Sequence, residues 1–397
     1  MKRIYFDNAA TSFPKPEPVF RAIDHYLRHA GNPGRGGHSF SLAGARAIFE
    51  ARESIAQFLG IAETERLLFT PGCTESINIV LKGMVRQGKL SRGDRVVTTN
   101  MEHNSVMRPL TELAGDPGIE IVSVPYSCEE ERFGSALRAA LKDGAGLCIV
   151  SRASNVTGEL LPVKVASRLC AEAGVPLAVD AAQSAGKVEV DLSKSGVTFW
   201  CASGHKGLMG PPGVGLLYIA PGVDLAPLIT GGTGSHSESY EIPAILPDRF
   251  EAGTQPGQNI AGLAAAVGWL KKRGAEDMLR HELNLTQCFH AWADEHENVE
   301  IFGPGIMDGI RIEAEPWKMP VVAFRLKGID SNRVADALDS EYGIAVRSGL
   351  HCAYAAHKSL GTEKSGLVRA SFGPFNTMIE VEKLIASLAE VAAASGC

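Results

Sequence analysis

The chain has 397 residues, which is long enough for two lobes around a large hydrophobic core. A hydrophobic content of 45% and a mean hydropathy of +0.02 are typical of a soluble globular protein, and a net charge of −6 gives no reason to expect binding to nucleic acid or to an anionic membrane. The eight cysteines form neither a Cys-x-x-Cys pair nor a zinc-binding pattern, and no apolar run has the length of a signal core or a membrane span, so we expect a cytoplasmic protein without a metal site.

From about residue 17 to 270, apolar runs alternate with helical patterns, as in the β-α-β units of a parallel sheet. In chain order, the periodicity predicts helices over residues 18–30, 44–59, 75–87, 163–173 and 259–273, and strands over residues 147–151, 175–180, 197–202 and 216–219. Two further strands end near Thr70 and Thr99. From about residue 280 the pattern changes to a helix, a strand over 320–326, a helix from 331, a strand over 366–372 and a helix from 378, which predicts an α+β lobe.

Side chains that can carry chemistry follow several of the predicted strands. Lys206 comes after a buried run, and Asp180 ends another, so an amine and a carboxylate would lie at one edge of the sheet, where open α/β sheets bind ligands. Pyridoxal phosphate enzymes need an amine for a Schiff base and an acid partner for the pyridinium nitrogen. Asp180 could instead cap a helix. His103 could stack on a flat ring or be structural, and Asn155 could bind a phenolic oxygen.

The turn at Pro71 and Gly72 leads into a helix that begins with small polar residues, including Thr74. Free backbone N–H groups at a helix start bind phosphate, although an ordinary capped helix start is the alternative. Ser203 and His205 would add side-chain donors to the same phosphate.

These features resemble pyridoxal phosphate enzymes of the aspartate aminotransferase fold, in the class V aminotransferase group. Within that group the chain is similar to cysteine desulfurases and selenocysteine lyases. The resemblance covers nearly the whole chain and rests on segments 5–11, 249–254 and 368–371, and on the motifs Asp180-x-x-Gln183, Ser203-x-His205-Lys206 and Arg347-x-Gly-x-His351-Cys352.

The resemblance implies a type I PLP-dependent transferase fold of the α/β class. Residues 17–275 would form a large domain with a mostly parallel seven-stranded sheet. Residues 1–16 and 276–397 would form a smaller α+β domain that carries the catalytic cysteine. It also implies a two-fold homodimer in which His38 and Thr254 reach the cofactor site of the other subunit.

The resemblance assigns most of the site residues. Lys206 would be the Schiff-base lysine, His103 would stack on the ring and take part in catalysis, and Asp180 would face the pyridine nitrogen. Asn155 and Gln183 would flank the ring oxygen. The phosphate would be held by Cys73, Thr74, Ser203 and His205, and the substrate by His38, Asn155, Arg347 and Arg369.

Cys352 separates the reactions that this fold supports. An aminotransferase needs no thiol, whereas a desulfurase needs one to take the sulfur of the substrate and become a persulfide. We expect Arg347 and His351 to give the thiol basic surroundings. Arg369 offers a bidentate fork for the substrate α-carboxylate, with a surface salt bridge as the alternative. Cysteines in apolar or helical patterns are expected to be packing residues: Cys148, Cys170, Cys201 and Cys288.

The expected reaction converts L-cysteine to L-alanine and leaves a persulfide on Cys352 for transfer to a sulfur-acceptor protein, whose identity the sequence does not give. The alternatives are a selenocysteine lyase acting on L-selenocysteine, another C–S lyase, an aminotransferase, or a protein of this fold retained for partner binding. The 16 residues between Cys352 and Arg369 place the chain near the short-loop desulfurases, but Leu350 stands where a second histidine is common. Cys397 fits a frayed tail, with a secondary sulfur acceptor as the alternative.

Overall fold

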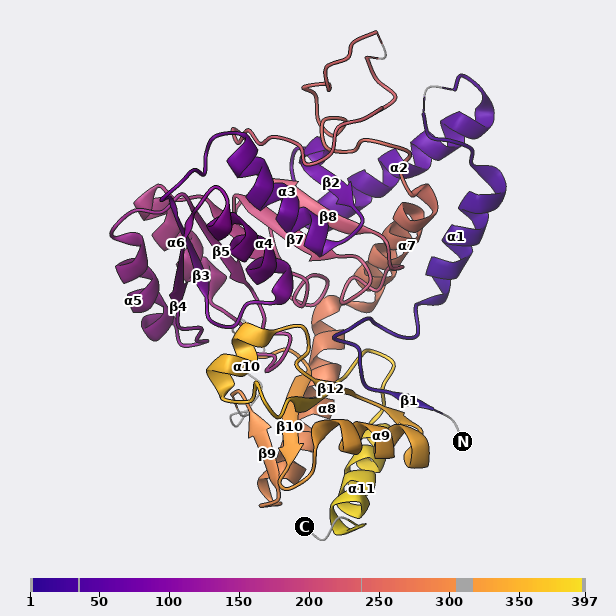
Figure 1. The fold of residues 1–397 in the computed structure, drawn as a ribbon. Coiled ribbons are helices and arrows are strands. Elements are labelled where there is room, and N and C mark those ends of the chain that lie inside the picture. The colour runs from indigo at the N-terminus through magenta and orange to yellow at the C-terminus, as the bar shows by residue number, and fades with distance from the viewer. Residues whose placement is uncertain (1–2, 35, 237, 305–316, 395–397) are drawn as a thin grey trace.

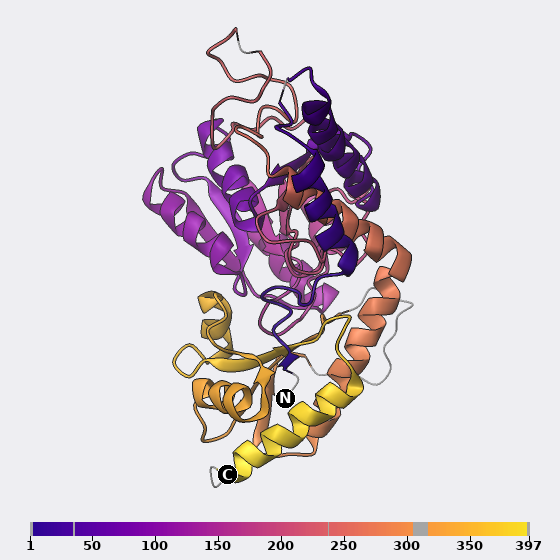
Figure 2. The same cartoon turned by 90° about the vertical axis from the view of Figure 1, so that its right-hand side faces the viewer.

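The computed structural model describes residues 3–34, 36–236, 238–304 and 317–394, and shows two lobes joined by two consecutive helices (Figure 1). Cys397 and Arg35 lie outside the described residues. Figure 2 shows that the helix at residues Ala275–Asp294 (α8) runs from the large lobe along the side of the small lobe, and that both chain ends lie at the small lobe. Within the described residues, no helix is long and apolar enough to cross a membrane.

The large lobe is built on a seven-stranded mixed sheet, as the resemblance implied. Six strands run parallel, and β8 alone runs against its two neighbours. Across the sheet the order is β2 (Leu67–Thr70), β8 (Gly215–Ile219), β7 (Phe199–Ser203), β6 (Leu177–Asp180), β5 (Leu147–Ser151), β3 (Arg95–Thr99) and β4 (Glu120–Val124). Every residue of β5, β6 and β7 is buried, which explains why their sequences are continuous apolar runs.

Helices cover both faces of this sheet and form two hydrophobic clusters. One cluster packs Ile55 and Leu263 against Trp200, and the other packs Ile77 and Leu110 against Phe199. The helices of the lobe are α1 (Glu17–His29), α2 (Ser39–Phe58), α3 (Cys73–Arg86), α4 (Asn104–Gly115), α5 (Glu130–Leu141), α6 (Val163–Ala173) and α7 (Gly257–Arg273), with a 3-10 turn at Thr64–Arg66.

Two helices begin earlier than the sequence predicts. Helix α2 starts at Ser39 rather than at 44, because Nδ1 of His38 accepts a hydrogen bond from the Ser41 N–H at 3.2 Å and caps the helix. Helix α8 starts at Ala275 rather than near 280, directly after α7 and Gly274. The predicted bounds of the other helices and strands differ by no more than two residues from those observed.

The small lobe has a four-stranded antiparallel sheet in the order β12 (Arg347–Gly349), β13 (Leu367–Ser371), β10 (Val321–Leu326) and β9 (Val299–Phe302). The N-terminal strand β1 (Ile4–Tyr5) pairs in parallel with β11 (Ile344–Ala345), so the first residues belong to this lobe. The lobe has its own hydrophobic cluster, in which Phe6 and Phe324 are fully buried. Its other helices are α9 (Ser331–Tyr342), α10 (Tyr354–Leu360) and α11 (Met378–Ala394).

Candidate active site

A pocket lies at the edge of the large sheet where the parallel strands end. Strands β3, β5, β6 and β7 run in the same direction, so the segments that follow them meet at this edge. Strand β2 also ends there, because it and β7 both pair antiparallel with β8. The pocket is lined by Cys73, Thr74, His103, Ser105, Ser151, Ala153, Asn155, Asp180, Ala182, Gln183, Ser203 and Lys206. The residues in this list that sequence reasoning missed are Ser105, Ser151, Ala153 and Ala182.

Lys206 supplies the pocket with an amine in an unusual environment. Burial lowers the pKa of Lys206, and the neighbouring Asp180 carboxylate opposes that shift. The Oδ1 atom of Asp180 accepts hydrogen bonds from the Ala182 N–H at 2.9 Å and from the Cys73 thiol at 3.3 Å, which fixes the orientation of the carboxylate. A desolvated amine has a larger neutral fraction and is a better nucleophile.

His103 is held at the N-terminus of α4. Its Nδ1 atom accepts a hydrogen bond from the Ser105 N–H at 3.0 Å and lies 2.8 Å from the Ser105 hydroxyl. Because Nδ1 is an acceptor, a neutral ring carries its proton on Nε2. Burial, opposed by Asp180, lowers the pKa of His103 to about 4. The pocket is therefore bordered by an uncharged aromatic ring, which can stack on another ring.

The N-terminus of α3 forms one wall of the pocket. Its N-cap is Gly72, and no side chain from the described residues caps it, so the first N–H groups of the helix are left for a ligand. The main chain is tightly packed here, because a Cβ on Gly215 would lie 2.5 Å from the Gly72 Cα. Backbone donors and a helix dipole at a rigid turn suit a phosphate group.

Cys352 lies in a turn of the small lobe that is strained and exposed. His351 and Cys352 have φ values of +51° and +56°, and the Ala353 N–H donates to the Leu350 carbonyl at 2.9 Å. This pattern is that of a type I′ turn, and a left-handed conformation costs an L-residue on the order of 1–2 kcal/mol. Such strain persists only where the surroundings enforce it.

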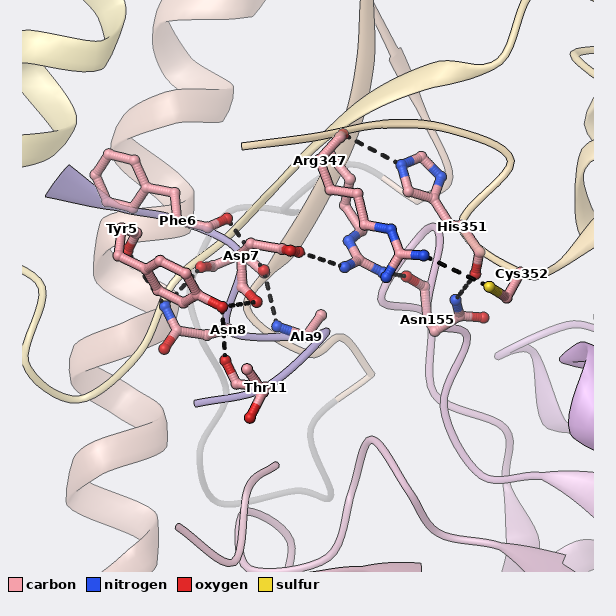
Figure 3. A network of polar contacts seen from close by, with 12 residues as sticks. Tyr5, Phe6, Asp7, Asn8, Ala9, Thr11, Asn155, Arg347, His351 and Cys352 are labelled. Carbon is pink, nitrogen blue, oxygen red and sulfur yellow. Dashed lines mark hydrogen bonds and ion pairs between the residues drawn. The ribbon is translucent and has the colours of Figure 1, made fainter. Parts of the chain in front are cut away.

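Two hydrogen bonds from the pocket segments hold this turn. The Asn155 side-chain N–H donates to the His351 carbonyl at 2.8 Å, and the Asn104 N–H donates to the Cys352 carbonyl at 2.8 Å (Figure 3 shows the first). Asn155 follows β5 and lines the pocket, whereas Asn104 follows His103. The turn that carries the thiol is therefore bonded to both segments that border the pocket.

The basic surroundings of Cys352 come from Arg347 and not from His351. An Nη2 atom of Arg347 lies 3.5 Å from the Cys352 sulfur (Figure 3). The His351 ring is buried against the Arg347 carbonyl at 3.3 Å, and burial and the Arg369 charge lower the pKa of His351 to about 2. The expectation that His351 adds positive charge beside the thiol is therefore wrong, because its ring is neutral and points into the lobe.

Arg369 is buried rather than exposed, which excludes the surface salt bridge. Its Nη2 donates to the Asp7 carboxylate at 2.6 Å, and its Nη1 donates to the Asn155 carbonyl at 2.9 Å. Its Nε has no hydrogen-bond partner among the described residues, although it is buried. A buried unpaired N–H costs free energy, so this guanidinium can take a further anionic ligand.

Besides the small-lobe residues Arg347, Cys352 and Arg369, three further predicted residues do not line the pocket. His205 pairs through Nδ1 with the Thr11 hydroxyl at 3.1 Å, and burial lowers its pKa to about 4. His38 is exposed and caps α2, and Thr254 lies exposed in the loop before α7. The binding of the phosphate by His205 therefore stays a prediction. The approach of His38 and Thr254 to the cofactor site of the other subunit also stays a prediction.

The cysteines that we expected to be packing residues lie at buried or half-buried positions. Cys148, Cys170 and Cys201 are buried and Cys288 is half-buried, consistent with packing roles. In the part of the chain that the structure describes, no three histidine, cysteine, aspartate or glutamate side chains are arranged to hold a metal ion. Gln183 donates to the Ala9 carbonyl at 3.0 Å and so links the pocket to the N-terminal segment.

Comparison with known proteins identifies the family. The model of the Aminotransferase class-V family matches residues 4–384. The chain belongs to the class V aminotransferase family. Enzymes of this family depend on pyridoxal phosphate. Two relatives are probable cysteine desulfurases. The protein from Methanothermobacter thermautotrophicus is 34% identical, over 98% of this chain and 94% of the relative. The protein from Pyrococcus abyssi is 36% identical, over 98% of this chain and 94% of the relative.

A solved class V structure has the same fold over almost its whole length. The apo structure of a cysteine desulfurase from Thermococcus onnurineus superimposes with a TM-score of 0.89 at 35% identity, and the match covers 99% of this chain and 95% of that one. The similarity therefore includes both lobes and the segment that carries Cys352.

Proposed function

We propose that this protein is a pyridoxal phosphate-dependent cysteine desulfurase, which converts L-cysteine to L-alanine and holds the sulfur as a persulfide on Cys352. The observation that carries the proposal is the exposed Cys352 thiol on a strained turn that is hydrogen-bonded to the segments after β3 and β5. An aminotransferase of the same fold has no use for such a thiol. The cysteine desulfurases among the relatives support the same substrate class.

The pocket residues fit pyridoxal phosphate. Lys206 offers an amine of lowered pKa, Asp180 offers a fixed carboxylate for a ring nitrogen, and the start of α3 offers uncapped N–H groups for a phosphate. His103 would border the ring, with Gln183 and Ser203 also in reach as pocket residues. When bound, the cofactor withdraws electrons from the substrate Cα and thereby makes the substrate proton and C–S bond labile.

The residues around the pocket would bind and orient the amino acid. Arg369 is placed to take the α-carboxylate, since Asp7 and Asn155 each take one N–H of its terminal nitrogens and its buried Nε has no partner among the described residues. The Lys206 amine, whose pKa is lowered by burial, would move the Cα proton of the substrate. Because Lys206 and Asp180 lie in the large lobe and Arg369 in the small lobe, the substrate would lie between the lobes.

Cys352 would then take the sulfur. The guanidinium of Arg347 lies 3.5 Å from the sulfur, where it can pair with the thiolate that acts as the nucleophile. The thiolate attacks the substrate sulfur, an S–S bond forms and the C–S bond breaks. The electron pair of the C–S bond stays on the substrate carbon, which takes up a proton and becomes the methyl group of alanine. Sulfur remains as a persulfide on Cys352, whose exposure allows transfer to an acceptor protein.

The assembly and compartment follow from the same proposal. We propose a homodimer in which the loops of His38 and Thr254 approach the partner's pocket, and the exposed apolar side chains of α2, Phe40, Leu42 and Phe49, support a subunit contact. An exposed nucleophilic thiol stays active only where reductants keep it reduced, which favours the cytoplasm.

Replacement of Cys352 by alanine tests the reaction. Cys352→Ala should still bind pyridoxal phosphate and cysteine, because Lys206, Asp180 and Arg369 remain. Alanine production from cysteine should fall by several orders of magnitude, since a covalent catalyst is lost rather than a binding contact. The measurement is alanine released per enzyme over time, with Cys128→Ala as a control at a half-buried cysteine in the loop between β4 and α5.

The outcomes also separate the alternatives. Wild-type alanine production by Cys352→Ala would contradict the desulfurase mechanism. Amino-group transfer to a keto acid by both proteins would indicate an aminotransferase. Selenide release from selenocysteine by the wild type, with no sulfide or alanine from cysteine, would indicate a selenocysteine lyase.

A further inference from the structure

A chain of hydrogen bonds runs behind the Cys352 turn and is not part of the reaction described above. Nε2 of His351 lies 3.3 Å from the Arg347 carbonyl, and Nδ1 of His351 lies 3.2 Å from Nε2 of His357. Nδ1 of His357 lies 2.8 Å from the Thr362 hydroxyl. The chain thus joins β12, the thiol turn, helix α10 and the residue that follows this helix. His351, His357 and Thr362 are at most 2% exposed.

The geometry fixes the direction of every bond in this chain. A carbonyl only accepts, so Nε2 of His351 carries the proton, and Nδ1 of a neutral His351 is an acceptor. His357 must therefore donate from Nε2, because a proton on its Nδ1 would leave two lone pairs facing each other at 3.2 Å. Nδ1 of His357 is then an acceptor, and the Thr362 hydroxyl donates to it.

The surroundings keep both rings neutral, as this arrangement requires. Burial and the positive charges of Arg369 and Arg347 lower the pKa of His351, and burial lowers the pKa of His357. A proton added to His351 would place two N–H groups against each other unless the proton on His357 moved to Nδ1. The chain is thus a fixed support rather than a group that titrates at neutral pH.

One end of the chain, Arg347, and the next residue in it, His351, are the two neighbours of the thiol. His351 precedes Cys352 in the strained turn, and the Arg347 carbonyl that accepts from His351 belongs to the residue whose guanidinium lies 3.5 Å from the sulfur. A shift of the His351 ring would therefore move the turn and the guanidinium relative to each other.

We propose that Thr362 and His357 are positioning residues for the Cys352 thiol, because their hydrogen bonds lock the His351 ring against Arg347 and so hold the guanidinium beside the sulfur. This inference deepens the proposed desulfurase function and rests on it only for the effect on turnover. The effect on the thiol itself follows from the hydrogen bonds alone.

The test compares alkylation of Cys352 by iodoacetamide at neutral pH in holoprotein variants, measured by mass spectrometry of the Cys352 peptide. Thr362→Val keeps the shape of the side chain and removes the hydroxyl, so alkylation and kcat for cysteine should both fall about tenfold, while KM changes little. Thr362→Ser keeps the hydroxyl and should stay within about twofold of the wild type.

A second pair of variants tests the middle of the chain. His357→Gln keeps an N–H group for Nδ1 of His351, whereas His357→Leu leaves that nitrogen without a donor, so the loss should be larger for His357→Leu. Ser359→Ala is the matched control, because Ser359 is a hydroxyl of the same helix that donates to the Asn100 carbonyl and lies outside the chain.

Wild-type or faster alkylation in folded Thr362→Val would overturn the proposal, as would an equal loss in Thr362→Val and Thr362→Ser. Melting temperature and cofactor content identify folded variants, and if His357→Leu does not fold, the comparison of Thr362→Val with Thr362→Ser still decides. Alkylation needs no turnover. Failure of the desulfurase proposal would therefore appear as missing alanine production in the wild type, with the alkylation results unaffected.

Discussion

At the scale of single residues, Lys206 shows how the fold changes the chemistry of a side chain. An exposed lysine is almost entirely protonated at neutral pH and is a poor nucleophile. Here burial lowers the pKa of Lys206, while Asp180 limits the shift. The same carboxylate is oriented by the Ala182 N–H and the Cys73 thiol. Its fixed position allows it to pair with a ring nitrogen rather than only with the Lys206 amine.

The covalent role of Lys206 leads to a direct prediction. Reduction of the holoprotein with borohydride should fix the cofactor to the chain, and peptide mass spectrometry should find the added mass on Lys206. Lys206→Ala should show no fixed cofactor, although it should keep some pyridoxal phosphate through Asp180 and the start of α3. Lys187→Ala, which changes a lysine paired with Glu282 outside the pocket, is the control. Fixed cofactor in Lys206→Ala would assign the lysine elsewhere.

The sequence predicts residue types at strand ends better than it predicts side-chain directions. Lys206 and Asp180 could be found because each follows a buried apolar run, and the edge of the sheet brings such positions together. His351 could not be interpreted correctly, because its direction depends on positive φ values and on hydrogen bonds to Asn155 and His357. Asn155 is 196 positions away in the chain, and no local pattern encodes that contact.

At the scale of elements, the close contact between β8 and the start of α3 positions the proposed phosphate site. Gly215 opens β8 and pairs with Thr70 at the end of β2. A Cβ on Gly215 would lie 2.5 Å from the Gly72 Cα and 2.6 Å from its carbonyl carbon, and main chain cannot move away as a flexible side chain can. Only glycine therefore permits this approach.

Replacement of Gly215 should weaken cofactor binding without unfolding the lobe. Gly215→Ala should push Gly72 and the first N–H groups of α3 out of position, and the affinity for pyridoxal phosphate should fall about tenfold or more. Equilibrium dialysis of the apoprotein with cofactor measures this. Gly268→Ala, on α7 with no atom of the described residues within 4 Å of the added Cβ, should bind as the wild type does. Equal affinities for the two variants would contradict the role given to this contact.

Element type was predictable, but strand neighbours were not. Continuous apolar runs identified β5, β6, β7 and β8 because buried strands of a covered sheet lack alternation. The same runs carry no information about the insertion of β8 between β2 and β7 or about its reversed direction. The start of α2 was missed because a histidine side chain serves as its cap, which is an uncommon choice.

At the scale of the whole molecule, buried neutral histidines make stability depend on pH. Burial lowers the pKa values of His103 and His205 to about 4, of His290 to about 3 and of His351 to about 2. The unfolded chain takes up these protons as the pH falls below about 6.5, whereas the native state does not. Acid therefore favours the unfolded state, by about 1.4 kcal/mol per pH unit for each histidine.

Buried carboxyls act in the opposite direction over part of this range. Burial raises the pKa of Glu102 to about 7 and also raises that of Glu282. The native state binds their protons first, so the stability that they contribute is present at low pH and is lost as the pH rises through the folded pKa. The histidines of lowered pKa outnumber these two groups, and we expect a net loss of unfolding free energy from pH 7 to pH 5.

His290 isolates the histidine contribution away from the site. It lies on α8, is 3% exposed, and its Nε2 has no partner among the described residues. His290→Leu should therefore cost little at pH 7 and should reduce the loss on going to pH 5 by about 2 kcal/mol. Urea unfolding at pH 7 and pH 5 measures the change in unfolding free energy. His25→Gln, at an exposed histidine, is the control. The same pH dependence in His290→Leu and wild type would contradict the account.

The division into lobes was predictable because the pattern of elements changes along the chain. Alternating strands and helices give way after α8 to pairs of strands, β9–β10 and β11–β12, separated by α9 and followed by α10, β13 and α11. We propose the boundaries 17–275 and 1–16 with 276–397 on that basis. The parallel pairing of β1 with β11, across more than 330 residues, and the exposed apolar face of α2 show only in the folded molecule.

The central claim is that Cys352 takes the sulfur of cysteine, and persulfide mapping tests it most directly. The wild-type holoprotein is given a limited amount of cysteine without reductant, trapped with a thiol alkylator and digested for mass spectrometry. The account predicts one extra sulfur, about 32 Da, on the Cys352 peptide, in an amount that matches the alanine formed. Alanine formed with no extra sulfur on Cys352, or with the sulfur on another cysteine, would contradict it.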